Sequence, residues 1–420
     1  MGRLFNWLCF LGVTMGFLYN EQLQAVSRMK NGCILNGDVG TGKSRTALYY
    51  YFVVVCGGEI QNKYKDMKNP MDLLIITTAG KRDSKEWEAE MLPFLLSTDP
   101  SQNHYSSLAK VTVDSWNNIK KYQDITNTFI IFDEDRVIGY GAWSKAFIKM
   151  AKANKWVMLS ATPGDDWKDY ISVFIANGFY KNKTEFEREH VIYKRSFVGY
   201  PQIDRYINIP RLMRLRRSIL VPIEMERITV AHHININVSY DEQTYKYVWK
   251  ERKDPETFEP IDNIAGVCYI LRKITNEHWS RAAAVVDIMR EREKAIIFYN
   301  FDFELDILRN LDYPEGTEVA EMNGHKHQPL PKGDRWVYLV HYNSGAEGWN
   351  CISTDTIIFY SQNYSYRIMK QASGRIDRRN TPYVDLYYYH LKTKSSIDMG
   401  IANALRKKKK FNETKFIGQL

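Results

Sequence analysis

The sequence predicts an α/β protein of two lobes, each built on a parallel sheet with helices on both faces. Two series of short apolar runs alternate with helical stretches, one at each end of the chain, and only the first contains a glycine-lysine loop. Short buried strands that alternate with helices are typical of parallel sheets covered on both faces. With 420 residues, the chain is long enough for two such lobes.

The first lobe is expected over residues 1–165. Its apolar runs are CILNGD, DLLIITTA, AKVTVDSW, TFIIFDED and KWVMLSATP, and helical stretches such as SKEWEAEMLPFLL separate them. Polar or glycine residues follow each run, and the carboxyl ends of parallel strands are where such sheets bind ligands. We therefore expect the functional residues of this lobe at that edge.

The strand pattern is expected to stop after the first lobe. Residues 166–225 are charged and include RLMRLRRS, so they are predicted to form a helical insert and an arginine-rich linker. A second series, KAIIFYNF, EVAEMNG, WVYLVHYNSG, DTIIFYSQ and VDLYYYHL, predicts a second lobe over residues 226–400. Residues 401–420 form a basic tail, whose lysine run is either an extra grip on a polyanion or a solvated helix end.

Composition is that of a soluble globular protein, with 44% hydrophobic and 25% charged residues. The formal net charge of +9 favours a polyanionic partner. The five cysteines are far apart and form no CxxC pair, which predicts buried thiols in a reducing cytosol rather than disulfides or zinc ligands. The apolar N-terminal stretch lacks a cleavage site and contains Asn6, so we expect neither a signal peptide nor a membrane span, and Met15 is an alternative start.

Residues 37–44 read GDVGTGKS, the G-x-x-x-x-G-K-S loop that cradles nucleotide phosphates. Its glycines let backbone N–H groups converge on phosphate oxygens at the positive end of the next helix. Lys43 is expected to reach the β- and γ-phosphates, and the Ser44 hydroxyl to ligate Mg²⁺. The residues expected to bind the nucleotide here are Gly37, Val39, Gly40, Thr41, Gly42, Lys43, Ser44 and Arg45.

An acidic pair, Asp133 and Glu134, ends the apolar run TFIIF. Both carboxylates are expected at the carboxyl edge of the sheet, beside the phosphate loop. Asp133 is expected to hold Mg²⁺ through water, and Glu134 to orient or deprotonate the attacking water. The adjacent acids favour hydrolysis over transfer to a small-molecule acceptor. The metal ligands expected from the chain are therefore Ser44 and Asp133.

Six motifs in order resemble those of superfamily 2 helicases and translocases of the DEAD/DEAH-box type. DVGTGKS, DEDR and LSATP resemble motifs I, II and III, MNG and SGAEGWN the motif V region, and QASGRIDRR motif VI. DSKEWEAEM and the linker with RLMRLRRS are similar to the Swi/Snf-like branch. The resemblance spans about residues 17–410, and the chain's size is similar to that of minimal motors of bacteria and their phages.

The resemblance implies two RecA-like lobes that use ATP and Mg²⁺. Gln22 falls where the family reads the adenine edge. Gln371, Arg375 and Arg378 would face the γ-phosphate from the second lobe, where a guanidinium stabilises charge on the transferring phosphoryl group. The catalytic residues that it implies are Lys43, Asp133, Glu134, Gln371, Arg375 and Arg378.

The resemblance also implies a face for nucleic acid. Coupling to the ATP site would run through Ser160, Ala161 and Thr162. Family contacts are mostly to phosphates and therefore independent of sequence. The candidates by position are Thr78, Lys81, Ser115, Trp116, Asn300 and Ser344. Trp116 either stacks on a base or packs between helices.

Two positions depart from the Swi/Snf-like branch. Arg136 stands where its acid box usually has His, and LSATP is the form of the wider superfamily. The function expected is an ATP-dependent DNA helicase or translocase in replication, recombination or repair, in the cytoplasm of a bacterial cell or phage-infected host. Its partners would be single-stranded, duplex or branched DNA and replication or recombination proteins, with no membrane. The alternatives are an ATPase clamp without translocation, an RNA helicase, and a P-loop kinase or switch.

Overall fold

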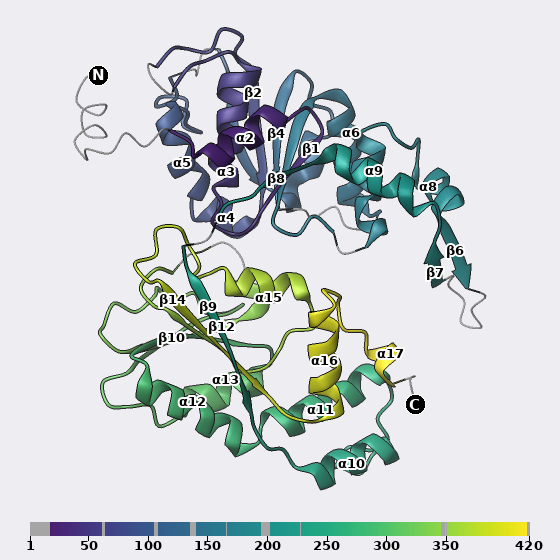
Figure 1. Ribbon diagram of the computed structural model, residues 1–420, viewed down its shortest axis with the longest axis vertical. Coiled ribbons are helices and arrows are strands. Elements are labelled where there is room, and N and C mark those ends of the chain that lie inside the picture. Colours follow the sequence, from purple (N-terminus) through teal and green to yellow (C-terminus); the bar gives the residue numbers. More distant parts are fainter. Residues whose placement is uncertain are drawn as a thin grey trace. The chain divides into compact units, whose positions relative to one another are not determined.

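The computed structural model describes residues 17–60, 64–104, 108–134, 140–164, 166–194, 202–226, 228–345, 349 and 351–417. Residues 1–14, Arg136 and most of SGAEGWN, which the sequence singled out, lie outside these ranges. The chain divides into two compact units, Met1–Met225 and Glu226–Leu420 (Figure 1). Each unit contains one parallel six-stranded sheet with helices on both faces, so the predicted class of two RecA-like lobes is confirmed.

The sheet of the first unit has the order β3-β2-β4-β5-β1-β8, and every neighbouring pair is parallel. Its first five strands in the chain coincide with the apolar runs of the first lobe. The strands are β1 (Cys33–Gly37), β2 (Asp72–Thr77), β3 (Val111–Ser115), β4 (Thr128–Asp133), β5 (Lys155–Ser160) and β8 (Leu220–Ile223).

Alternate residues of these strands enter two different cores, as the two-residue period of a strand requires. In β2, Leu73 and Ile75 pack with α2 (Asn20–Arg28), α3 (Lys43–Tyr49) and α5 (Glu86–Met91). Leu74 and Ile76 pack on the other face, with α6 (Ala142–Ala153) and α7 (Ile171–Ala176). Shorter elements complete the lobe: η1 (Tyr50–Val55), α4 (Ala79–Asp83), η2 (Leu92–Phe94), η3 (Trp116–Tyr122) and η4 (Trp167–Tyr170).

The segment 166–225 contains helices, but the strand pattern does not stop there. Besides α8 (Lys183–His190) and α9 (Ile209–Ile219), it contains an antiparallel hairpin of β6 (Val191–Lys194) and β7 (Gln202–Tyr206). Its last strand, β8, is the short apolar run Leu220–Ile223, which pairs with β1 and so extends the first sheet. Figure 1 shows the hairpin projecting from the first unit beyond α8.

The second sheet has the order β11-β12-β10-β13-β14-β9, again with parallel neighbours. Five strands follow the predicted series, whereas β9 precedes that series in the chain. The strands are β9 (Val230–Asn237), β10 (Lys294–Tyr299), β11 (Glu318–Met322), β12 (Trp336–His341), β13 (Thr356–Phe359) and β14 (Asp385–Lys392).

Helices cover both faces of this sheet too. In β10, Ile297 and Tyr299 pack with α12 (Trp279–Glu291) and α13 (Asp302–Arg309), whereas Ile296 and Phe298 pack with α15 (Tyr366–Ser373). The remaining helices are α10 (Glu242–Glu251), α11 (Ile264–Asn276), α14 (Tyr342–Gly345), α16 (Ser396–Arg406) and α17 (Glu413–Ile417).

The C-terminal segment is partly packed rather than wholly a basic tail. Ile401 of α16 and Phe411 are buried in a core formed with α10 and α11. Four cysteines, Cys33, Cys56, Cys268 and Cys351, are free and buried, as expected. Among the described helices, none combines the length and apolar character needed to cross a bilayer.

Candidate functional site

Three strands bring the sequence motifs of the first lobe to one edge of its sheet. β5 lies between β1 and β4, with Asn36 opposite Ser160 and Leu159 opposite Asp133. Because the strands are parallel, the glycine loop, the acidic pair and residues 160–162 all follow carboxyl ends at the same edge. This is where doubly covered parallel sheets bind ligands.

The glycine loop after β1 has room only for glycine at its turn into α3. Gly42 is the N-cap residue of α3 and has a left-handed backbone, with φ of 70°. A Cβ there would lie 2.3 Å from Nε2 of Gln22, and a Cβ on Gly37 would lie 2.5 Å from Oγ1 of Thr41. Side chains therefore approach the backbone of Gly37 and Gly42 too closely for a Cβ, and a close backbone approach is what glycines permit in an anion-binding loop.

Gln22 fastens α2 to the loop. Its side chain is buried, its Oε1 accepts from the backbone N–H of Tyr19 at 2.9 Å, and its Nε2 donates to the carbonyl oxygen of Thr41 at 3.0 Å. The residue expected at the adenine edge is thus already a structural part of the phosphate loop.

Lys43 spans the loop that precedes it. Its Nζ donates to the carbonyl oxygens of Gly37 at 2.8 Å and Asp38 at 2.9 Å. Phosphate oxygens carry charge and accept more strongly than carbonyls, so the ammonium is placed to exchange these partners for a phosphate.

The other predicted loop residues lie at the start of α3 or just before it. Ser44 and Val39 are half-buried, and the Ser44 hydroxyl makes no hydrogen bond within the described part of the chain. Arg45 is paired with Glu90 of α5 at 3.2 Å, which engages its guanidinium outside the loop. Ser44 therefore has a hydroxyl available for a metal, whereas Arg45 has a structural partner.

The carboxylate of Asp133 is buried and collects three donors. Its Oδ2 accepts from Thr77 Oγ1 at 2.8 Å, Lys81 Nζ at 3.0 Å and Trp87 Nε1 at 3.2 Å. We did not expect Thr77 or Trp87 in the site. Two features of the sequence could have pointed to them. Thr77 lies at the polar end of the apolar run DLLIITTA, and Trp87 is the tryptophan of DSKEWEAEM.

Glu134 adopts a left-handed backbone, with φ of 61°. Such conformations are strained for residues other than glycine and cluster at functional sites. Its Oε1 lies 3.5 Å from Lys81 Nζ. Burial alone would lower the pKa of Lys81, but Asp133 and Glu134 outweigh it and raise that pKa above its usual value. Lys81 is therefore an ammonium at neutral pH.

The predicted nucleic-acid residues of the first lobe differ in exposure, and Thr78 and Lys81 are half-buried. The hydroxyl of Thr78 accepts from Lys81 N at 3.3 Å and caps α4, the helix that carries Lys81. Ser115 and Trp116 are buried, at 1% and 2% exposure. Ser115 Oγ accepts from Arg82 at 3.2 Å.

Trp116 packs in the core, which was the second of its two expected roles. Its ring stacks on Phe132, with centroids 5.6 Å apart. Its Nε1 donates to the carbonyl oxygen of Asp133 at 2.9 Å. In this structure the ring has no free face for a base.

The predicted coupling residues sit at the end of β5. Ser160 and Ala161 are buried, and the backbone N–H of Thr162 donates to Ser160 Oγ at 3.1 Å. The Thr162 hydroxyl oxygen is buried and has no hydrogen-bond partner among the described residues. A buried hydroxyl without a partner is uncommon and marks a position for a water or ligand atom.

The residues at this edge fit a nucleoside triphosphate with Mg²⁺. The loop offers backbone N–H groups and an ammonium, and Ser44 and Asp133 offer oxygen ligands. Thr162 offers a hydroxyl that has no hydrogen-bond partner in the described part of the chain. Mg²⁺ is commonly held by one or two protein oxygens together with substrate phosphates and water. The donor set therefore fits. Among the described residues, at this edge or elsewhere, no three His, Cys, Asp or Glu side chains gather as a metal cluster.

The motif VI residues of the second lobe lie on α15 and the turn that follows it. Gln371 is buried, and Arg375 Nε donates to its carbonyl oxygen at 3.0 Å. Arg375 Nη1 donates to the carbonyl oxygen of Trp349, and its own carbonyl accepts from Cys351 N at 3.0 Å. Arg375 is thus anchored within its lobe, whereas Arg378 is half-buried.

Asn300 and Ser344 follow β10 and β12 in the second lobe. The Asn300 amide donates to Ser361 Oγ at 2.8 Å and accepts from Asn363 Nδ2 at 2.8 Å. Its backbone N–H donates to Glu304 Oε2 at 2.7 Å. Ser344 is half-buried on α14. The amide of Asn300 thus organises its own sheet edge.

Comparison with known proteins gives a distant similarity. No protein-family model and no curated protein matches this sequence. One similar solved structure is the SWI2/SNF2 ATPase core of Sulfolobus solfataricus in complex with dsDNA, with a TM-score of 0.39 and 17% identity. The match covers 96% of this chain and 92% of that chain.

Proposed function

We propose that this protein is a nucleic-acid-dependent ATPase that moves along or remodels DNA, as a helicase or translocase. The observation that carries the proposal is the carboxyl edge of the first sheet. There the glycine loop and the acidic pair follow strands that flank the same central strand. A kinase for small molecules needs an acceptor pocket instead, and the adjacent acids at this edge favour water as the acceptor.

The first lobe supplies the residues for hydrolysis. The loop N–H groups and Lys43 would bind the phosphates, and Ser44 and Asp133 would hold Mg²⁺, which neutralises charge that develops on the phosphate oxygens. Glu134 would orient the attacking water and accept its proton. Residues 1–165 would form this ATP-binding lobe, and residues 226–400 the second lobe.

The second lobe would supply the guanidinium groups of motif VI. Arg378 is half-buried, whereas Arg375 would first exchange the carbonyl oxygens of Gln371 and Trp349 for phosphate. Phosphate is the stronger acceptor, so this exchange is favourable once the nucleotide is bound. Binding energy that is used to rearrange a lobe is what couples hydrolysis to movement.

DNA is the proposed track on two grounds. The chain has a formal net charge of +9, and its motifs resemble a branch that acts on duplex DNA. Contacts to phosphates would make binding largely independent of sequence and strongly dependent on salt.

The test is ATP hydrolysis by the full chain alone and with single-stranded DNA, duplex DNA and RNA. Lys43→Ala is the inactive variant, and Lys30→Ala, at an exposed lysine of the same lobe, is the matched control. We expect DNA to stimulate hydrolysis in the wild type and the control but not in Lys43→Ala. Hydrolysis that ignores every nucleic acid would overturn the proposal in favour of a kinase or switch.

A second measurement separates the forms of the proposal. A helicase displaces a labelled strand from a duplex, and a translocase without strand separation displaces a triplex-forming strand instead. An ATPase clamp would show DNA-stimulated hydrolysis and neither displacement. Stimulation by RNA alone would replace DNA with RNA as the track.

A further inference from the structure

Lys81 has one role that the structure shows, as the partner of two carboxylates, and a second that the resemblance implies. Its Nζ lies 3.0 Å from Asp133 Oδ2 and 3.5 Å from Glu134 Oε1. The three side chains are 17%, 3% and 14% exposed, so water screens these contacts only weakly. Lys81 is also one of the six residues that the resemblance to superfamily 2 implies as nucleic-acid contacts.

The contact with Lys81 opposes a metal at Asp133. Of the three donors on Asp133 Oδ2, Thr77 and Trp87 are neutral and only Lys81 carries charge. A cation that binds the same carboxylate meets the repulsion of this ammonium at short range and low dielectric. Asp133 is therefore a better Mg²⁺ ligand when Lys81 is elsewhere.

The helix that carries Lys81 is held from the end of β3. Arg82, the next residue, donates from Nη1 to Asp114 Oδ1 at 3.3 Å and Ser115 Oγ at 3.2 Å. Asp114 is in turn fixed by Asn118 at 2.8 Å and Tyr122 at 2.7 Å. The backbone around Lys81 is thus anchored independently of Asp133. The four-carbon stem of a lysine lets its ammonium change partners without moving the helix.

We propose that Lys81 is an electrostatic switch: it neutralises Asp133 and Glu134 in the free protein, and releases them when its ammonium binds a DNA phosphate. DNA binding then completes the Mg²⁺ site and turns hydrolysis on. This inference rests on the proposed function and extends that function by assigning the stimulation of hydrolysis by DNA to one residue. The competing explanation is that Lys81 only stabilises the buried Asp133.

The first test measures Mg²⁺ binding without catalysis. Mg²⁺ is titrated into the full chain with a fluorescent, non-hydrolysable ATP analogue, with and without duplex DNA. Without DNA, we expect Lys81→Gln to reach half-saturation at an Mg²⁺ concentration about tenfold lower than the wild type. A tenfold change in affinity corresponds to the free energy of about one charge-assisted hydrogen bond. DNA should lower the wild-type value to that of the variant and leave the variant unchanged.

The matched control is Lys120→Gln, which removes an exposed lysine from the neighbouring η3 element. It should behave as the wild type in both conditions. If Lys81→Gln needs as much Mg²⁺ as the wild type, or more, Lys81 is only a structural partner of Asp133 and the switch is wrong.

A second variant changes a carboxylate that contacts Lys81 instead of Lys81 itself. It keeps the proposal testable if Lys81→Gln does not fold. Glu134→Gln removes one of the two carboxylates that hold Lys81, so without nucleotide it should bind duplex DNA several-fold more tightly than the wild type. By linkage, Mg²⁺ with the analogue should raise wild-type DNA affinity by the same factor by which DNA raises Mg²⁺ affinity. Unchanged or weaker DNA binding by Glu134→Gln would contradict the switch.

The outcomes separate this inference from the proposed function. If DNA stimulates wild-type hydrolysis but leaves the Mg²⁺ requirement unchanged, the switch is overturned and the proposed function stands. If no nucleic acid stimulates hydrolysis, the proposed function fails and the switch fails with it.

Discussion

The indole Nε1 of Trp116 donates a hydrogen bond of 2.9 Å to the carbonyl oxygen of Asp133, and so joins the end of β3 to the end of β4. Both residues are buried. A residue that the sequence predicts on the nucleic-acid face is therefore bonded directly to one predicted at the metal. Movement at the end of β3 would shift the carboxylate that the ATP site depends on.

Trp116→Phe keeps one aromatic ring beside Phe132, but it removes the indole donor together with part of a buried ring. Leaving the buried Asp133 carbonyl without this partner should lower the free energy of unfolding by about 1–3 kcal/mol. A small displacement of Asp133 should also lower kcat for ATP hydrolysis, by about tenfold or more, because misplacing a catalytic group by about 1 Å costs up to about 10² in rate. Urea unfolding and steady-state kinetics with saturating DNA measure both effects.

The control for Trp116→Phe is Trp279→Phe, since Trp279 is 73% exposed on α12 of the second lobe. That substitution should leave stability and hydrolysis close to wild type. Wild-type hydrolysis by Trp116→Phe would show that the bond does not position Asp133.

Gly42→Ala should disable the phosphate loop. Alanine in the left-handed backbone at φ 70° costs about 1–2 kcal/mol, and its Cβ would lie 2.3 Å from Gln22 Nε2. We expect ATP-analogue affinity to fall by more than about tenfold, because the loop or Gln22 must shift. Fluorescence titration measures this.

Gly141→Ala is the matched substitution for Gly42→Ala. The backbone of Gly141 is outside the left-handed region, and a Cβ there meets no atom within 4 Å. Its nucleotide affinity should equal that of the wild type. Tight nucleotide binding by Gly42→Ala would mean that the loop does not use its present geometry to bind phosphate.

Arg375→Ala should lower both stability and hydrolysis. Arg375 is 5% exposed and bonded to Gln371 and Trp349, so its loss should lower the free energy of unfolding by about 1–3 kcal/mol. If the motif VI arginines stabilise the transferring phosphoryl group, Arg375→Ala and Arg378→Ala should each lower kcat by on the order of 10³. Urea unfolding and steady-state kinetics measure these effects, and a wild-type kcat in either variant would contradict that role.

The sequence predicts the two sheets because their central strands are apolar runs that need no context to be recognised. It does not predict β8 and β9, because Leu220–Ile223 and VAHHININ lie at sheet edges, where a strand is decided by the neighbour it pairs with. The phosphate loop and the acid pair were predictable for a similar reason, since their chemistry is local. The bonds from Thr77, Lys81 and Trp87 to Asp133 join residues far apart in the chain, so only the fold shows them.

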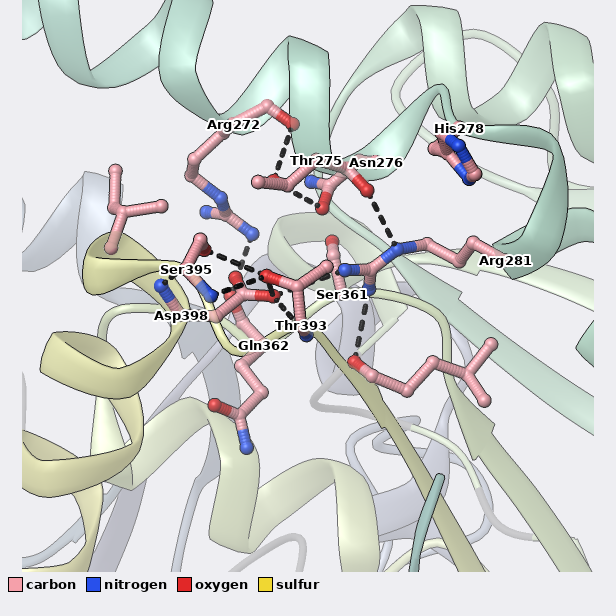
Figure 2. A network of polar contacts seen from close by, with 12 residues as sticks. Arg272, Thr275, Asn276, His278, Arg281, Ser361, Gln362, Thr393, Ser395 and Asp398 are labelled. Atoms are coloured by element: carbon pink, nitrogen blue, oxygen red, sulfur yellow. Dashed lines mark hydrogen bonds and ion pairs between the residues drawn. The ribbon is translucent and has the colours of Figure 1, made fainter. Parts of the chain in front are cut away.

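A buried arginine should dominate the stability of the second lobe. Arg281 is fully buried and donates to Asp398 Oδ2 at 3.1 Å and to the carbonyl oxygens of Thr275 at 3.2 Å and Leu391 at 2.9 Å (Figure 2). Arg281→Met leaves the buried Asp398 without its counter-charge, which costs about 3–5 kcal/mol. Calorimetry or urea unfolding measures the loss.

Arg290→Met is the control for Arg281→Met, because Arg290 lies on the same helix and is 69% exposed beside Asp287. Exposed ion pairs contribute at most about 1 kcal/mol, so its stability should stay near wild type. If both substitutions lower the free energy of unfolding by the same amount, the network in Figure 2 is not what stabilises this lobe.

His390 should make the second lobe sensitive to acid. Burial, and then the neighbouring His233, lower the pKa of His390 from 6.5 to about 3, and its Nε2 lies 3.0 Å from His233 Nδ1. A pKa lowered by folding means that the unfolded chain binds the proton first, so stability is constant above about pH 6.5 and falls as the pH drops towards 3. Between pH 7 and pH 5, His390 should account for a loss of about 2 kcal/mol. His390→Gln should remove most of that loss in urea unfolding at the two pH values, whereas His104→Gln, at a half-exposed side chain of the first lobe, should retain it. An equal loss in His390→Gln would place the acid sensitivity elsewhere in the chain.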